Sequence, residues 1–178
     1  MIWESNYWKD DLLRRAKMLR VRTRQKRWPE ASSAKVELAL MTGFYAVRKL
    51  IEAKKLTDAL VAKRIPVWEF PAIGKPIHLF NWHHIDRLYA LQKSKKSQID
   101  VEHLCHQFVH SYVFLLSFDD KRQLNGVFLS SDKKRSSCLY YVEIRAIIDL
   151  FERVGRNYSA SGSFAWDAKR LDYVVKNC

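Results

Sequence analysis

The sequence is poor in glycine, proline and cysteine. Its 178 residues include five Gly, four Pro and three Cys, which argues against a glycine-rich or all-β design. The cysteines are Cys105, Cys138 and Cys178, and they are far apart and form no CxxC pair. Neither a disulfide framework nor a zinc ribbon is therefore expected, and a reducing cytoplasm is the predicted compartment.

Long hydrophobic runs and nucleotide-binding motifs are also missing. The longest apolar run, SYVFLLSF, is far too short to span a bilayer, and MIWESNYWKDDLL has no apolar core of a signal peptide. No P-loop, GxGxxG or GxSxG motif occurs, so neither a phosphate-binding loop nor a hydrolase elbow is expected. These absences predict a cytoplasmic protein with no membrane partner and no cofactor.

Negative charge is scarce relative to positive charge. The chain has 19 Asp and Glu against 32 Lys and Arg, a formal net charge of +13. Since 48% of the residues are apolar, we expect a folded globule, with residues 1–178 forming a single domain. An excess of this size favours an anionic partner such as nucleic acid. The alternative is a soluble protein that merely has a high isoelectric point.

Hydrophobic periodicity predicts an α+β fold with a helical N-terminal half. The expected helices cover about residues 6–27, 29–55, 81–91, 100–110 and 143–154. The proline-rich segment 65–76 is expected to be extended across the surface of the core, and QKSKKSQ is expected to be a basic loop. Strands near 113–118, 127–131 and 138–142 predict a three-stranded antiparallel meander, with Asn125 and Gly126 in a turn that tolerates positive φ. The meander is followed by a C-terminal amphipathic helix, then a loop with one late strand.

The first predicted helix makes residues 1–28 strongly basic. Eight cations fall within fourteen residues, too many for one helix face, so the C-terminal half of this helix should stand in solvent. Phosphate binding needs cations, and a neighbouring aromatic side chain can stack on a base. The predicted contacts are Arg14, Arg15, Lys17, Arg20, Arg22, Arg24, Lys26, Arg27 and Trp28. Our main hypothesis is a small basic nucleic-acid-associated protein that binds RNA or DNA mainly through phosphates. The alternative is a merely solvated helix face.

The stretch VEHLCHQFVHSYVFLL concentrates histidines on one predicted helix. At 100° per residue, His103, His106 and His110 share a polar face with Gln107, whereas Cys105 faces the core. His106 and His110 have an i,i+4 spacing that can chelate a metal ion. Because no HExxH or paired Cys/His pattern accompanies them, we expect no metal. Histidine is also suited to acid–base catalysis near neutral pH.

The segment CHQFVHS resembles a degraded form of the motif helix of the HEPN family. That resemblance implies a helical domain and a metal-independent ribonuclease, in which an Arg holds the scissile phosphate and a His moves a proton as the ribose 2′-hydroxyl attacks. His110 matches the motif histidine and His106 the polar position, but Cys105 stands where the Arg belongs. A protein of this kind would be catalytically silent or would recruit another Arg, for which Arg87 is the candidate.

Four further segments are similar to a set of small uncharacterised bacterial proteins: YWKDDLL, GFYAVRKL, HLFNWHHID and CHQFVHSYVF. This resemblance implies a bacterial or mobile-element origin and no particular activity. It supports a third hypothesis, a protein-interaction subunit of a bacterial defence or mobile-element system that uses the aromatic segment IPVWEF. The sequence leaves open whether the protein is an enzyme.

Overall fold

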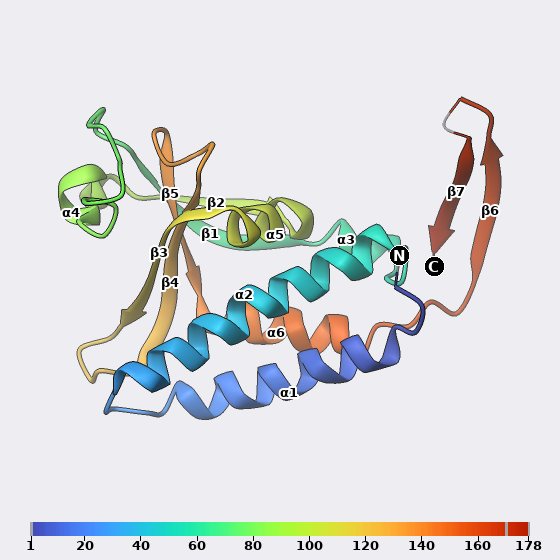
Figure 1. Ribbon diagram of the computed structural model, residues 1–178, viewed down its shortest axis with the longest axis horizontal. Helices are drawn as coiled ribbons and strands as arrows, with labels where there is room; N and C mark the ends of the chain where they lie inside the picture. Colours follow the sequence, from blue (N-terminus) through green and yellow to red (C-terminus); the bar gives the residue numbers. More distant parts are fainter. Residues whose placement is uncertain (1, 170, 178) are drawn as a thin grey trace.

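Two long helices, α1 (Asn6–Arg22) and α2 (Glu30–Glu52), begin the computed structural model, which describes residues 2–169 and 171–177. Leu12, Ala16 and Leu19 form the buried stripe of α1 at helical spacing. After Leu19 no side chain of α1 is buried, and the helix ends at Arg22, five residues before the predicted end. The two helices run in opposite directions beside α6 (Figure 1).

A stack of aromatic rings joins the helices into one layer. Phe44 of α2 stacks on Phe108 of α5 (Val101–Val109) at 3.7 Å between ring centroids and meets Phe151 of α6 (Ile144–Gly155) edge-on at 5.1 Å. The neighbouring Gly43 makes this approach possible, because a Cβ there would lie 2.5 Å from Phe151. The Asp100 side chain caps α5 by accepting a hydrogen bond from the His103 N–H.

The central sheet contains five antiparallel strands in the order β2-β1-β5-β4-β3. Their bounds are β1 Arg64–Pro71, β2 Lys95–Asp100, β3 Ser111–Phe118, β4 Leu124–Ser131 and β5 Cys138–Glu143. The helices α1, α2, α5 and α6 lie on one side of this sheet, and α4 (Ile85–Leu88) lies on the other (Figure 1). A small apolar cluster that includes Ile77, Tyr89 and Leu139 joins the α4 segment to that second face.

The predicted architecture is therefore wrong, although the structure is an α+β fold. The sheet has five strands instead of three, because the proline-rich segment and the basic segment form β1 and β2. Pro66 is tolerated because β1 pairs with β5 only from Trp68 onward, and Pro71 ends the strand. Strand β2 resembles a loop in sequence because it lies at the sheet edge and, of its six residues, only Ile99 is buried.

The predicted turn at Asn125 and Gly126 is also misplaced. Both residues lie within β4, and Gly126 pairs with Ser117 and Glu143. The chain reverses before β4 begins, in the segment 119–123. There Arg122 has a positive φ of 60°, and the Asp119 side chain accepts hydrogen bonds from two backbone N–H groups. A Cβ at position 126 would lie 2.4 Å from the Tyr141 ring, so the glycine makes room for that ring.

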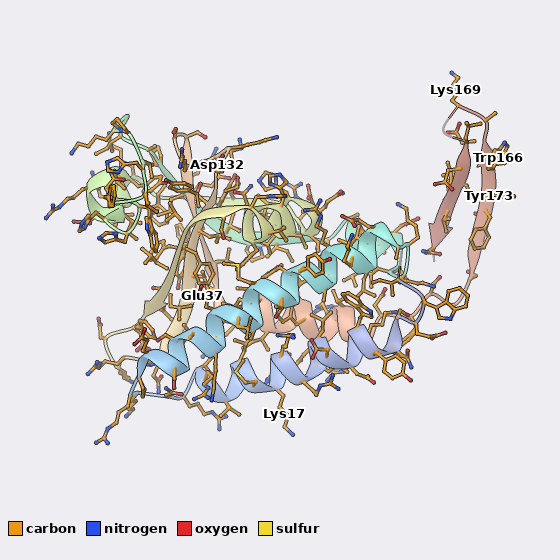
Figure 2. All side chains as sticks on the ribbon, viewed as in Figure 1. Lys17, Glu37, Asp132, Trp166, Lys169 and Tyr173 are labelled. Carbon is orange, nitrogen blue, oxygen red and sulfur yellow. The ribbon has the colours of Figure 1, made fainter. Side chains whose placement is uncertain are left out.

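A second, two-stranded sheet follows α6, where a loop with one strand was predicted. It consists of β6 (Gly162–Asp167) and β7 (Asp172–Asn177), and it extends away from the rest of the molecule with Trp166 and Tyr173 exposed (Figures 1 and 2). Asn177 anchors its base by donating to the carbonyls of Lys54 and Leu56. The remaining short helices are α3 (Asp58–Val61) and a 3-10 turn at Leu91–Lys93. None of the helices in residues 2–169 and 171–177 combines the length and apolar character needed to cross a membrane.

Candidate nucleic-acid interface

Three of the eight predicted cations of the N-terminal segment have acidic partners. Arg14 and Arg15 both pair with Asp11 within α1, and Arg15 also donates to the Thr42 hydroxyl. Arg20 pairs with Glu152 of α6. The Arg20 pair and the Arg15 hydrogen bond to Thr42 link α1 to α6 and α2. Exposed ion pairs of this kind contribute only about 0–1 kcal/mol each.

The other five cations have no acidic partner among the residues that the structure describes. Among the described residues, the Arg22 side chain donates only to the neutral side chain of Gln25. The remaining four are exposed and have no side-chain hydrogen bond or ion pair within the described part of the chain: Lys17, Arg24, Lys26 and Arg27. Figure 2 shows Lys17 pointing away from the body of the protein. These charges are therefore free to meet an external anion.

A cleft of about 660 Å³ lies beside the end of α1 and the β3–β4 turn. Its positive side chains are Arg20, Arg24 and Arg145, and Tyr141 of β5 also lines it. Four carboxylates share the cleft, namely Asp119, Glu143, Asp149 and Glu152. Glu152 and Asp149 are already paired with cations, whereas Glu143 is exposed and has no ion pair among the described residues.

Trp28 is occupied by contacts within the protein. Its indole N–H donates to the carbonyl of Arg122 at 2.8 Å, and its ring lies 4.9 Å from that of Phe118. The side chain thus fastens the α1–α2 connection to the β3–β4 turn. The contact of Trp28 with nucleic acid stays a prediction. The hydrogen bond to Arg122 and the packing on Phe118 are enough to explain where its side chain lies.

Two further groups of cations come from elements other than the N-terminal segment. Lys95 and Lys96 lie on the edge strand β2. Lys133, Lys134 and Arg135 lie in the β4–β5 turn, at the opposite end of β4 from the turn that contacts Trp28. The Arg135 guanidinium is also stacked on the Tyr112 ring at 3.7 Å.

The three histidines of α5 occupy different environments. The His103 ring lies edge-on to Tyr140, and its Nε2 is 3.2 Å from the side-chain nitrogen of Gln107. Gln107, predicted to lie on the polar face, is buried, and its Oε1 accepts a hydrogen bond from the Ser131 N–H of β4. Cys105 is buried as predicted, and burial raises the pKa of its thiol far above the usual range.

His106 and His110 lie together at the C-terminal end of α5, with ring centroids 4.7 Å apart. Burial lowers the pKa of His106 from its usual value, and electrostatic interactions with neighbouring groups, including His110, Lys133 and Arg48, lower it further. His110 is exposed, and its Nε2 lies 3.1 Å from Nη1 of Arg48 on α2. Because a guanidinium can only donate, this contact requires an unprotonated Nε2 on His110.

Arg48 is the functional candidate that the sequence patterns did not reveal. It precedes His110 by 62 residues and reaches it only because α2 packs on α5. Arg87, the cation expected to replace the missing motif arginine, lies on α4 across the sheet and pairs with Asp86. The structure thus supplies an Arg beside His110, but a different one from the residue expected.

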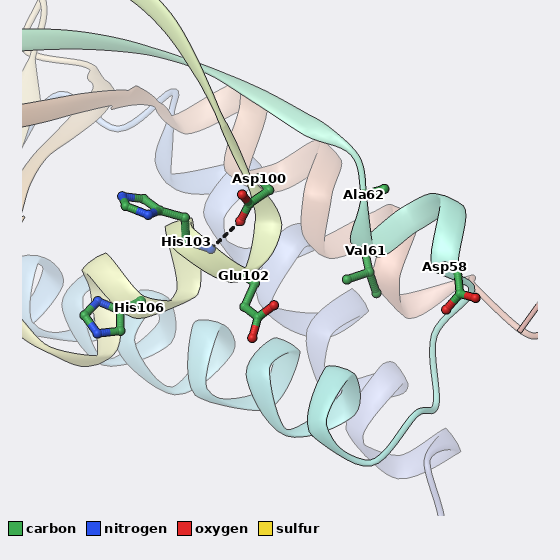
Figure 3. Close-up of a pocket in the computed structure, with 7 residues that line it drawn as sticks. All are labelled: Asp58, Val61, Ala62, Asp100, Glu102, His103 and His106. Atoms are coloured by element: carbon green, nitrogen blue, oxygen red, sulfur yellow. Dashed lines mark hydrogen bonds between the residues drawn. The ribbon is translucent and has the colours of Figure 1, made fainter. Parts of the chain in front are cut away.

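A shallow pocket of about 590 Å³ adjoins His103 and His106 and is lined by carboxylates at its other side (Figure 3). Asp58 comes from α3, and Asp100 and Glu102 come from the start of α5. The described residues contain no group of three or more His, Cys, Asp or Glu side chains placed to hold one metal ion. The acidic end of this face repels phosphate, whereas Arg48 and Lys133 are positive groups near His106, with the Arg48 Nε paired to Glu52 at 2.8 Å.

Comparison with known proteins finds no matching family model, no similar curated protein and no similar solved structure. The resemblances to the HEPN motif and to small bacterial proteins therefore stay predictions. Function must be inferred from the side chains of this chain alone.

Proposed function

We infer that this protein binds nucleic acid, mainly through contacts between its N-terminal cations and phosphate groups. The observation that carries this inference is the set of five cations between Lys17 and Arg27 that have no acidic partner among the described residues. Unpaired cations gain from contact with phosphates, because binding releases condensed counterions from the nucleic acid. A net charge of +13 adds long-range attraction.

The test is a comparison of two triple variants with the same loss of charge. Lys17→Gln/Arg24→Gln/Arg27→Gln removes three unpaired cations, whereas Lys75→Gln/Lys169→Gln/Lys176→Gln removes three exposed cations from other surfaces. Binding of a fluorescent oligonucleotide is followed by anisotropy at several salt concentrations. The first variant should lower the slope of log Kd against log salt by about 2, since each phosphate contact on a single strand contributes about 0.7. Equal effects of the two variants would contradict this assignment.

A second candidate function is a metal-independent ribonuclease at His110. The contact between Arg48 and His110 favours it, because an unprotonated imidazole can accept the proton of a ribose 2′-hydroxyl and a neighbouring guanidinium can hold the phosphate. The His106 ring 4.7 Å away offers a second group for proton transfer. This is the chemistry that the HEPN-like motif implies.

Cleavage assays with chelator present test this candidate. RNA should be cleaved and DNA of the same sequence left intact, because DNA lacks the attacking hydroxyl. Both His110→Ala and Arg48→Ala should abolish cleavage, whereas His83→Ala and Arg87→Ala, which alter the α4 segment, should not. Failure of the wild-type protein to cleave any RNA would remove the ribonuclease candidate and leave the binding proposal untouched.

A further inference from the structure

We propose that the face of the central sheet opposite the helix layer binds single-stranded nucleic acid, with bases stacked on Trp68 and Tyr141. This proposal rests on the proposed nucleic-acid binding and specifies the form of its ligand. It also assigns base stacking to Trp68 and Tyr141 on the sheet instead of Trp28, whose indole N–H is bonded to the β3–β4 turn.

The register of the strands places one row of residues across all five strands. Lys96 of β2 pairs with Trp68 of β1, Trp68 pairs with Tyr141 of β5, Tyr141 pairs with Phe128 of β4, and Phe128 pairs with Leu115 of β3. Side chains at paired positions point to the same face of a sheet. The flanking positions Val67 and Val142 are buried in the core beneath the helices, so the row faces the other way.

The rings of this row are accessible and held in place. Trp68 and Tyr141 are partly exposed, and the Lys96 ammonium lies over the Trp68 ring at 5.0 Å. The ring centroids of Tyr141 and Phe128 are 4.9 Å apart. The Tyr141 ring also lies across Gly126, and a Cβ at position 126 would collide with this ring. Rings that are already oriented lose little conformational entropy when a base stacks on them.

Two hollows that share Glu143 border this row. The first is a depression of about 450 Å³ lined by Trp68, Lys96, Gln98 and Glu143. Glu143 also lines the cleft that contains Arg20 and Arg24. A single strand that crosses both hollows would contact Trp68 and Lys96 in the first and Tyr141, Arg20 and Arg24 in the second.

The chemistry of the two hollows favours a nucleic acid over an acidic protein. Glu143 repels phosphate, but its carboxylate can accept hydrogen bonds from the exocyclic amino groups of bases. The Gln98 amide, exposed on the next row, can both donate and accept. A duplex hides the faces of its bases, so stacking on Trp68 and Tyr141 selects a single strand.

The experiment measures binding of single-stranded RNA and DNA of about 12 nucleotides, within the usual site size, and of a duplex of the same length. Trp68→Leu and Tyr141→Leu should each weaken single-strand binding by about five- to a hundredfold and leave duplex binding unchanged. Trp68→Phe and Tyr141→Phe keep an aromatic ring and should retain most of the affinity. Comparing them with the leucine variants distinguishes a loss of stacking from a loss of folding. Trp166→Leu, on the exposed hairpin, is the matched control and should have no effect.

The outcomes distinguish the stacking site from the more general proposal that the N-terminal cations bind phosphates. If single strands and duplexes bind equally and the leucine variants bind like wild type, the stacking site is refuted while phosphate binding stands. If no nucleic acid binds in dilute buffer, both fail. If Trp68→Leu instead dissolves a complex with a second copy or another protein, the face is a protein interface and the proposal is overturned. Preference between RNA and DNA identifies the source of the ligand.

Discussion

At the scale of single residues, local spacing predicts what depends on near neighbours and misses what depends on packing. The burial of Cys105 and the cap formed by Asp100 follow from positions within one helix turn. The contact between Arg48 and His110 joins two elements, and no short motif encodes it. Trp28 was predicted to stack on bases because it follows the N-terminal cations, but its indole N–H bonds to the carbonyl of Arg122. The place of Trp68 on the sheet depends on strand register, which no local pattern shows.

His106 gives a prediction about stability and pH. Its folded pKa is lowered by burial and then by electrostatic interactions with neighbouring groups, whereas an unfolded chain has a His pKa of about 6.5. As the pH falls below that value the unfolded state binds the proton first, so stability is retained above about pH 6.5 and declines below it. His106→Gln should lose less stability than wild type between about pH 7.5 and about pH 5.5, measured by urea unfolding. Identical losses would show that His106 has no part in this dependence.

At the scale of elements, helices with a buried stripe were predictable and the polar edge of the sheet was not. The stripes of α2 and α6 repeat at helical spacing, and both helices appear close to their expected bounds. Strand β2 carries only one buried side chain, so no alternating pattern marks it, and β1 contains prolines that normally argue against a strand within a sheet. Both strands form because β2 pairs with β1 and β1 pairs with β5.

Gly43 provides a test of the packing between α2 and α6. On an isolated helix, replacing Gly by Ala stabilises by about 1 kcal/mol. Here the new methyl group would lie 2.5 Å from Phe151, which is fully buried, and overpacking of a core costs about 1–3 kcal/mol. Gly43→Ala should therefore lower the free energy of unfolding, as measured by denaturant titration. An increase in stability would show that the two helices do not approach so closely.

At the scale of the whole molecule, positive charge is in excess, and cations without an ion pair among the described residues lie at the end of α1, on β2 and in the β4–β5 turn. Composition was sufficient to predict an anionic partner as a class, because +13 is an excess that pairing within the chain cannot absorb. Composition could not show which cations remain unpaired, since Arg20 reaches Glu152 only through tertiary packing. Nor could it show that the basic end of α1 adjoins an open, aromatic sheet face.

The salt dependence of wild-type binding to a single-stranded oligonucleotide tests the central claim most directly. Contacts from three to five unpaired cations, at about 0.7 per neutralised phosphate, predict a log–log slope between about 2 and 4. Affinity should thus fall steeply as salt is raised. Undetectable binding at low salt, or an affinity that does not change with salt, would contradict the account.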